Sequence, residues 1–278
     1  MKNISVCVPA DNSGSALATT LRSILEQDTD VEVILLDNAS TDDTAALAYS
    51  FDDPRVHLHR NAEALPLGEH WNKAVSLSTG RFVKVVRAGD SLLPGALDKQ
   101  LEVMGDNSIA LCSAKYQIVD AAGRVRQTDR GLPHLLGRRD ARAVLRALVP
   151  RGPADFGPTA TTVFRRQDFD RVGGFRGDPG YPMDVDLIAR LCLLGAFYGM
   201  PETLAARPDS GSDPIDDTSP VTKLTEMLRL HHRLAAEYPQ YVGRGAVLGG
   251  DLRLVRAAAR RVRPRTLASA LRRPELPH

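Results

Sequence analysis

The stretch ISVCVPADNSGSALATTLRSILEQDTDVEVILLD, residues 4–37, contains a strand pattern, a helix pattern and a second strand pattern. The two apolar runs, Ile4–Val8 and Val31–Leu36, are short and rich in β-branched residues, as buried strands are. Between them, Ala16–Gln27 has the apolar spacing of an amphipathic helix. This order predicts two parallel strands joined by a helix.

The same alternation continues through the first half of the chain. Further strand patterns cover Arg55–His59 and Arg81–Val86, and helix patterns follow Thr44 and cover Trp71–Ser78. We therefore expect an α/β fold with a mostly parallel sheet, flanked by helices on both faces. Ligands of such sheets bind beyond the carboxyl ends of the strands. The segments expected at that rim are Pro9–Asn12, Asp37–Ser40 and Arg87–Asp90.

The pattern changes after Pro94. A long strand is predicted at Ile109–Asp120, followed by a hairpin turn and a second strand. The basic segment GRRDARAVLRALVPRG, residues 137–152, favours a helix, TATTVFR at 159–165 a strand, and residues 183–194 another helix. Ala205–Ser219 is rich in Pro, Asp, Ser and Gly and reads as a loop or linker. Val221–Tyr238 and Leu252–Arg263 then predict an appended helical tail.

The composition is that of a soluble globular protein. The 278 residues are 43% hydrophobic and 25% charged, and no apolar run approaches the roughly 20 residues that a membrane span needs. Cys7, Cys112 and Cys192 lie in apolar segments without metal-ligand spacing. We interpret them as buried thiols in a reducing compartment and expect a cytoplasmic protein.

The formal charge of +2 hides an asymmetry. Eight arginines and no acidic residue lie between Arg253 and Arg273. Such a tail can bind nucleic acid, anionic lipid or an acidic partner, or can be a solvated helix face. No aromatic residue interleaves with the arginines, which disfavours single-stranded nucleic acid. Peripheral membrane contact, dimerisation and simple coverage of the domain stay open.

Asp37 and Asn38 end the second predicted strand. A carboxylate and an amide at that position can bind a flat heterocycle such as uracil. The same pair can also form an Asx turn that caps the next helix. The residues alone leave both interpretations open.

Asp184 and Asp186 lie in the first turn of a predicted helix, in YPMDVDLIARL. Acidic residues there cap free N–H groups, and one of them can also project into a cleft as a general base. Gly173 and Gly174, shortly before, would let the backbone approach a ligand closely.

Three cations could neutralise a diphosphate near the rim: Lys73, Lys84 and Arg87. Lys84 is the weakest candidate, because its place within a strand favours burial. Trp71 is more typical of a core position than of a stacking platform. His231 and His232 are adjacent on a helix pattern and face different directions, so we interpret them as surface or packing residues.

Six ordered motifs together resemble family 2 glycosyltransferases of the GT-A fold over residues 1–210: ISVCVPADN, VEVILLDNASTDDT, GEHWNKAVSLSTGRFVKVV, AGDSLLPGAL, FRRQDFDRVGGF and MDVDLIARL. The resemblance implies a Rossmann-like domain at 1–210, with a nucleotide-sugar-binding half at 1–108 and an acceptor-binding half at 109–210. Residues 211–278 would form a linker and an arginine-rich helical tail.

The resemblance also implies an activity. The enzyme would transfer a hexose or N-acetylhexosamine from a nucleotide-diphosphate sugar, expected to be a UDP-sugar, to an acceptor hydroxyl with inversion. Asp184 would be the general base. The nucleotide-binding residues would be Pro9, Asp11, Asp37, Asn38, Asn72, Lys73 and Arg87. The sugar and acceptor would lie beside Gly173, Gly174, Phe175 and Asp186.

The departures from the family pattern concern the metal. The Asp-x-Asp motif that usually holds a divalent cation aligns with Arg87-Ala88-Gly89, which leaves only Asp90. Where many relatives have Arg-x-His, this chain has Arg207 and Asp209. We therefore expect a weak Mg²⁺ or Mn²⁺ site at Asp90, with help from Asp209. The alternative is a metal-independent enzyme in which Arg87 holds the leaving group.

Two other functions are open at this level. The incomplete Asp-x-Asp motif would suit a nucleotide-sugar-binding partner subunit that has lost catalysis. So would Met183, which stands where the family usually has an acidic residue. The retained Asp184 argues against that. A dinucleotide-binding oxidoreductase is disfavoured because PADNSGSA replaces the Gly-x-Gly-x-x-Gly turn after the first strand.

Overall fold

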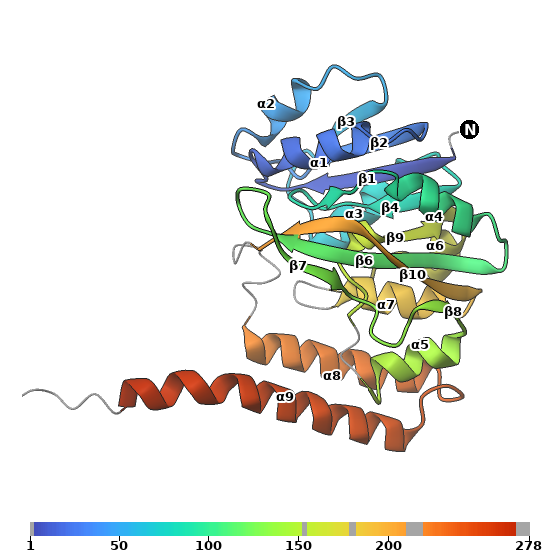
Figure 1. The fold of residues 1–278 in the computed structure, drawn as a ribbon, viewed down its shortest axis with the longest axis vertical. Coiled ribbons are helices and arrows are strands. Elements are labelled where there is room, and N and C mark those ends of the chain that lie inside the picture. Colours follow the sequence, from blue (N-terminus) through green and yellow to red (C-terminus); the bar gives the residue numbers. More distant parts are fainter. Residues whose placement is uncertain (1–2, 152–154, 178–181, 210–218, 271–278) are drawn as a thin grey trace, which may run out of the picture.

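A computed structural model describes residues 3–151, 155–177, 182–209 and 219–270; in the last range it describes the side chains of Ser219 and of residues 221–259. One mixed sheet runs through the domain, with strand order β3-β2-β1-β4-β9-β6-β10-β5. In addition, β7 pairs with β6 and β8 pairs with β10. Both predicted halves of the domain therefore contribute strands to a single sheet (Figure 1).

The first half is parallel, as the alternation predicted. β1 (Ile4–Ala10) lies between β2 (Val31–Asp37) and β4 (Phe82–Val85), and β3 (Val56–Arg60) lies outside β2. Every residue of β1, β2 and β4 is buried. The register pairs Ala10 with Asp37, so the polar residues after β1 and β2 lie at one edge. The connecting helices are α1 (Ala16–Leu25), α2 (Thr44–Tyr49) and α3 (Leu67–Ser76).

The second half is joined mainly by antiparallel pairs. β9 (Thr162–Arg165) is antiparallel to both β4 and β6 (Ile109–Val119), whereas β10 (Ala196–Pro208) is parallel to β6. The other strands here, all antiparallel to their partners, are β5 (Ser91–Leu92), β7 (Val125–Arg130) and β8 (Gly137–Arg139). The sheet is thus mixed, and the expectation of a mostly parallel sheet fits its first half only.

Helices pack on both faces of the sheet, as predicted. One hydrophobic core contains residues of α3, α5 (Ala141–Leu148), α7 (Met183–Leu191) and α8 (Pro220–Glu237). The other contains residues of α1 and α4 (Ala96–Met104). Two shorter elements flank β9, the 3-10 turn Thr159–Thr161 and α6 (Arg166–Val172). The three cysteines are buried and free, in agreement with the prediction from their apolar surroundings.

β10 is the longest of the elements that the sequence analysis missed. The segment AFYGMPETLAARP contains Gly199 and Pro201, which usually interrupt strands, and its pairing with β6 shifts register between Gly199 and Thr203. The predicted loop from Ala205 therefore begins only after Pro208. The rest of that predicted linker, residues 210–218, lies outside the described residues.

The C-terminal tail is helical, but its second helix is longer than predicted. α9 (Arg244–Ala270) begins eight residues before Leu252 and projects beyond the body at the left of Figure 1, the side toward which β1 runs from the N-terminus. His231 Nδ1 and His232 Nε2, both on α8, each lie 2.9 Å from an Asp251 carboxylate oxygen on α9. Adjacent histidines thus hold the two helices together. Residues 271–278 lie outside the described part.

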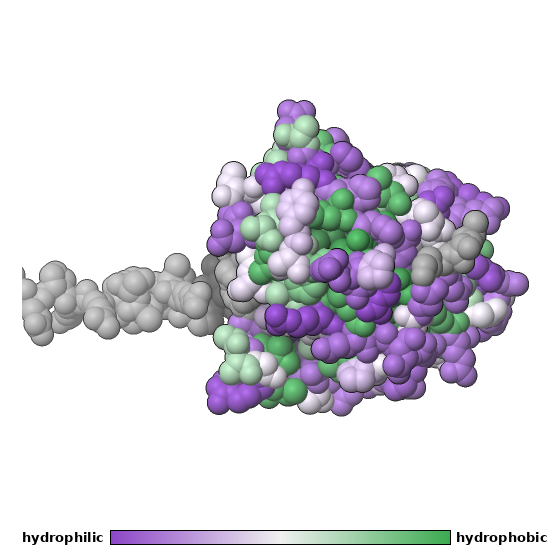
Figure 2. Space-filling view, turned by 90° about the horizontal axis from the view of Figure 1, so that it is seen from above, coloured by the Kyte–Doolittle hydropathy of each residue, from purple (hydrophilic) through white to green (hydrophobic). Residues whose placement is uncertain are grey.

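The described helices do not combine the length and apolar character that crossing a bilayer requires. The face on the α2 side is a mosaic in which hydrophobic residues lie among hydrophilic ones (Figure 2).

Candidate functional site

A cavity of about 530 Å³ opens at the carboxyl ends of β1, β2 and β4. The first half of the chain supplies most of its wall, and the end of β10 supplies the rest. The predicted rim therefore exists, with one contribution that was not foreseen. The lining residues that concern the chemistry are Pro9, Asp11, Asn38, His70, Trp71, Arg87, Asp90 and Arg207.

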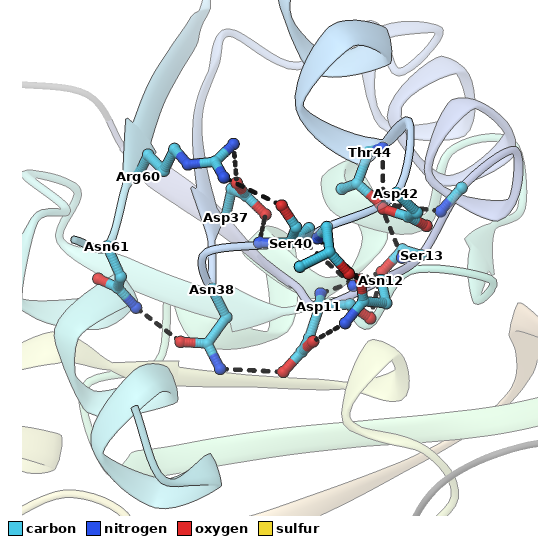
Figure 3. Close-up of polar contacts among 12 residues, drawn as sticks. Asp11, Asn12, Ser13, Asp37, Asn38, Ser40, Asp42, Thr44, Arg60 and Asn61 are labelled. Atoms are coloured by element: carbon cyan, nitrogen blue, oxygen red, sulfur yellow. Dashed lines mark hydrogen bonds and ion pairs between the residues drawn. The ribbon is translucent and has the colours of Figure 1, made fainter. Parts of the chain in front are cut away.

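Asn38 and Asp11 form a fixed pair at one end of the cavity. The Oδ1 atom of Asn38 accepts from the Leu65 N–H at 2.9 Å, which sets the orientation of the amide. Its Nδ2 then donates to Leu65 O at 3.1 Å and to Asp11 Oδ2 at 2.9 Å. The other Asp11 oxygen accepts from Asn12 Nδ2 (Figure 3). Two amides thus hold one carboxylate at the cavity wall.

Asn61 and His70 extend this network, and sequence reasoning missed both. Asn61 Nδ2 donates to Asn38 Oδ1 at 2.8 Å and lies 3.3 Å from His70 Nδ1. Because an amide nitrogen only donates, Nδ1 is the acceptor and the imidazole is neutral. Burial lowers the pKa of His70 to about 4, which agrees with a neutral ring. The sequence did offer a signal for Asn61: it is a polar residue directly after β3, and polar site residues also follow the neighbouring parallel strands.

Asp37 points away from this cavity. Its carboxylate accepts from the Ser40 N–H at 3.2 Å and pairs with Arg60 at 3.0 Å (Figure 3). Asp37 is not among the residues that line the cavity. The Asx-turn interpretation therefore describes Asp37, and the cavity-facing interpretation describes Asn38.

Arg87, Asp90 and Arg207 come together at the other end of the cavity. Arg87 and Asp90 close a turn in which the Asp90 N–H donates to Arg87 O at 3.0 Å. β10 runs antiparallel to β5 with Ala206 opposite Ser91, and the next residue along, Arg207, lines the same cavity as Arg87 and Asp90. Two guanidinium groups and one carboxylate therefore share this end.

Asp184 lies in a small apolar hollow beside the cavity. The hollow is lined by Val85, Thr162, Phe175 and other side chains. Phe175 packs edge-on against Trp71 of the cavity wall, with ring centroids 5.3 Å apart, so the cavity and the hollow are neighbours. Burial raises the pKa of the Asp184 carboxyl, and the Arg87 and Arg207 guanidiniums oppose this shift.

The family model for Glycosyl transferase family 2 matches residues 5–173, more than half of the chain. The chain belongs to this family. An uncharacterized Mycobacterium tuberculosis protein is 33% identical over 214 residues, 73% of this chain and 66% of that protein. The Escherichia coli protein WfgD, a UDP-Glc:alpha-D-GlcNAc-diphosphoundecaprenol beta-1,3-glucosyltransferase, is 25% identical over 118 residues, 42% of this chain and 47% of its own. The chain thus spans about half to two thirds of the length of these curated relatives.

Solved structures share the fold. The S. aureus TarS fragment 1–349 in complex with UDP-GlcNAc has a TM-score of 0.65 at 17% identity, over 84% of this chain and 66% of that chain. The mannosyltransferase PcManGT from Pyrobaculum calidifontis, in complex with GDP-Man and Mn²⁺, has a TM-score of 0.66 at 18% identity. The match covers 99% of this chain and 77% of that chain. At these identities the likeness concerns the fold alone.

Several residues that the family resemblance assigned to ligands bind the protein itself. The Asn72 amide brackets the Phe175 backbone, accepting from its N–H at 2.8 Å and donating to its carbonyl at 3.0 Å. Asp186 is fully buried and pairs with Arg190 at 2.7 Å. Lys73 is exposed on α3 and is not among the cavity-lining residues.

Gly173 and Gly174 follow α6 with φ angles of +78° and +70°. Arg190 donates to the Gly174 carbonyl at 2.7 Å and to Val172 O at the same distance. This glycine turn therefore presents Phe175 to the hollow of Asp184. The Asp186–Arg190 pair is spaced i to i+4 on a helix, a signal of a salt bridge that the sequence offered.

The expected metal ligands do not meet in this family 2 domain. Asp90 lines the cavity, but Asp209 is exposed and is not among the lining residues. Its N–H donates to Val119 O, which holds it at the end of the sheet. Across the described ranges, no group of three or more His, Cys, Asp or Glu side chains is placed to hold a metal ion. One carboxylate between two arginines is a donor set that does not fit a protein-held divalent cation.

Proposed function

We propose that this chain is an inverting glycosyltransferase that moves a sugar from a nucleotide-diphosphate sugar to an acceptor hydroxyl. The observation that carries the proposal is the position of Asp184, an acid beside a cavity whose polar ends suit a nucleoside and a diphosphate. Membership in a transferase family supports the reaction class.

The nucleoside would lie at the Asp11 end. The Asp11 carboxylate is an acceptor for an N–H of the base or for a ribose hydroxyl. Its amide partners hold it in place, so little ordering is needed on binding. We expect a uridine nucleotide, because a carboxylate suits the N3–H of uracil; guanine, which also presents N–H donors, is the main competitor. The TarS structure contains UDP-GlcNAc, and the PcManGT structure contains GDP-Man.

Asp184 would act as the general base. Its raised pKa suits a group that must take a proton from the acceptor hydroxyl. The deprotonated oxygen attacks the anomeric carbon from the face opposite the diphosphate, which inverts that carbon in one displacement. The apolar hollow around Asp184 limits water, which would otherwise compete as the acceptor.

A nucleotide-sugar screen tests this function. Thermal shift or calorimetry with UDP-glucose, UDP-GlcNAc and GDP-mannose should find a donor that binds. Asp184→Asn should keep that binding and lose transfer by about 10² or more. The matched control is Asp170→Asn, because Asp170 is exposed on α6 away from both spaces. If no nucleotide-sugar binds, the proposal fails.

The same screen separates the enzyme from an inactive partner subunit. A subunit that only binds the donor would show binding without donor hydrolysis or transfer. Asp184→Asn would leave its donor binding unchanged. Slow hydrolysis of the donor in the wild-type chain, lost in Asp184→Asn, would identify the enzyme before its acceptor is known.

We also propose that α9 contacts an anionic membrane surface. Leu248, Leu252 and Val255 are 70%, 51% and 47% exposed and, spaced four and three residues apart, lie on one face of the helix. Arg253 and Arg256 are exposed beside them. An apolar stripe flanked by arginines suits the interface of a negatively charged bilayer. The relative WfgD is a glucosyltransferase for alpha-D-GlcNAc-diphosphoundecaprenol, and a lipid-linked acceptor of that kind would give such contact a purpose.

Vesicle cosedimentation tests the membrane contact. The full chain should bind phosphatidylglycerol vesicles and not phosphatidylcholine vesicles, and Leu252→Glu should reduce the binding. Leu194→Glu is the control, since Leu194 is 45% exposed elsewhere on the molecule. Dimerisation through this stripe is the competing outcome. It would appear as a dimer in light scattering that Leu252→Glu dissociates.

A further inference from the structure

We propose that Arg87 and Arg207 together hold the departing diphosphate and that the chain needs no divalent cation for this. The inference rests on the proposed function, because it concerns the leaving group of that reaction. Displacement at an anomeric carbon leaves negative charge on the diphosphate, and fixed positive charge must stabilise it. The donor set at this end of the cavity supplies that charge as guanidinium groups.

The backbone that carries Arg87 is fixed by a buried threonine. Thr20 on α1 donates to Asp90 O at 2.7 Å and accepts from the Gly89 N–H at 2.9 Å. Gly89 has a φ of +101°, and a Cβ there would lie 3.6 Å from Pro208 Cγ. The turn therefore packs against the end of β10.

Arg207 is fixed by the pairing of β10. Ala206 lies opposite Ser91, and the Leu93 N–H donates to Leu204 O at 3.0 Å. These bonds bring the end of β10 to the turn of Arg87 and Asp90, although the two segments are far apart in the sequence. Hydrogen bonds therefore hold the backbone that carries each arginine, so a diphosphate bound by both needs little rearrangement of the protein.

The charges at this end favour a dianion over a dication. Among the described side chains that line this end of the cavity, Arg87 and Arg207 are positive and Asp90 is negative, and Asp184 lies in the hollow beside them. The other carboxylate of the cavity wall, Asp11, is engaged by two amides at the nucleoside end. A divalent cation beside Asp90 would be repelled by both guanidiniums. Asp90 supplies one carboxylate beside two guanidiniums, which is a poor donor set for a metal.

The pair also couples leaving-group binding to the base. Arg87 and Arg207 both favour the ionised form of Asp184. When a diphosphate lies between them, its charge offsets theirs, and Asp184 becomes a stronger base. The acceptor proton then passes to Asp184, the acceptor oxygen bonds to the anomeric carbon, and the electron pair of the broken bond stays on the diphosphate between the arginines.

Calorimetry on the full chain tests the inference. UDP and GDP, with UMP and GMP for comparison, are titrated in excess EDTA and in Mn²⁺. The preferred diphosphate should bind equally well in both conditions. Arg87→Met and Arg207→Met should each weaken it by about tenfold or more, as expected for a lost charge-assisted hydrogen bond, and should affect the monophosphate less. Arg207→Lys should recover part of the loss because it keeps the charge.

The control variant is Arg142→Met, because Arg142 is exposed on α5 and is not among the cavity-lining residues. Thermal melts establish that each variant folds. The inference is overturned if EDTA abolishes binding to the wild-type chain, or if Arg207→Met binds the diphosphate as the wild type does. If the wild-type chain binds neither UDP nor GDP, with EDTA or with Mn²⁺, the proposed function itself fails. That result can be told apart from the two results that overturn only the inference.

Discussion

Replacing Lys84 with methionine should flatten the pH dependence of stability. Lys84 is fully buried in β4, where its Nζ donates to Ala160 O at 2.5 Å. Burial lowers the pKa of Lys84 from 10.5 to about 7 in the folded chain. Between these two pH values the unfolded chain binds a proton that the folded chain does not, so the free energy of unfolding must rise with pH.

The size of the effect follows from the shift. Each pH unit in this window adds about 1.4 kcal/mol to the free energy of unfolding, so the gain between pH 7 and pH 9 is about 2–3 kcal/mol. Below pH 7 the contribution of Lys84 to the free energy of unfolding is constant and at its lowest. Lys84→Met removes the titrating group and with it this slope. Every other titrating group is common to both proteins and cancels in their difference.

Urea denaturation at pH 7, 8 and 9 measures this difference. The wild type should gain stability relative to Lys84→Met at each step. Lys99→Met, at an exposed position of α4, is the control and should keep the wild-type slope. Parallel stability curves for wild type and Lys84→Met would refute the reasoning, because they would mean that Lys84 stays protonated in the folded chain.

Two further predictions concern the support of the Asp184 hollow, and denaturation measures both. Gly174→Ala should cost about 3 kcal/mol, because its φ is +70° and a Cβ would lie 2.5 Å from Asn72 Oδ1, whereas Gly173→Ala, with a φ of +78° and nothing within 4 Å, should cost about 1 kcal/mol. Equal costs would contradict the steric argument. Arg190→Met should cost about 3–5 kcal/mol by leaving Asp186 charged and buried, and adding Asp186→Leu should restore most of it. A double variant no better than the single one would exclude this cause.

The sequence was informative where local pattern and topology coincide. The strands β1, β2 and β4 are short apolar runs between helices, so their parallel pairing and the rim at their carboxyl ends could be predicted. The polar residues at those ends, Asp11 and Asn38 among them, were found for the same reason. The expectation that Lys84 is buried within its strand is confirmed, because every residue of β4 is buried.

The remainder depended on contacts between distant segments. The sequence does not reveal that Arg60 draws Asp37 away from the cavity, or that Asn61 and His70 complete the Asn38 network. β10 was missed because Pro201 and the register shift near it hide the period of a strand. Without β10 in the sheet, nothing placed Arg207 at the same cavity as Arg87, and Lys73 and Lys84 were the other candidate cations for the diphosphate.

The place of β10 in the sheet has a consequence for synthesis. β10 lies between β6 and β5, and β5 was made long before it. A chain still on the ribosome that ends before residue 205 can form the parallel β3-β2-β1-β4 sheet, but β5 must wait for its neighbour. Such late, long-range closure is slow and leaves strand edges exposed in the meantime. The half that would recognise the nucleoside is therefore complete early. The cavity wall is finished only when β10 delivers Arg207 and Pro208 to it, so a chain that stops before β10 would lack part of the diphosphate site that we propose.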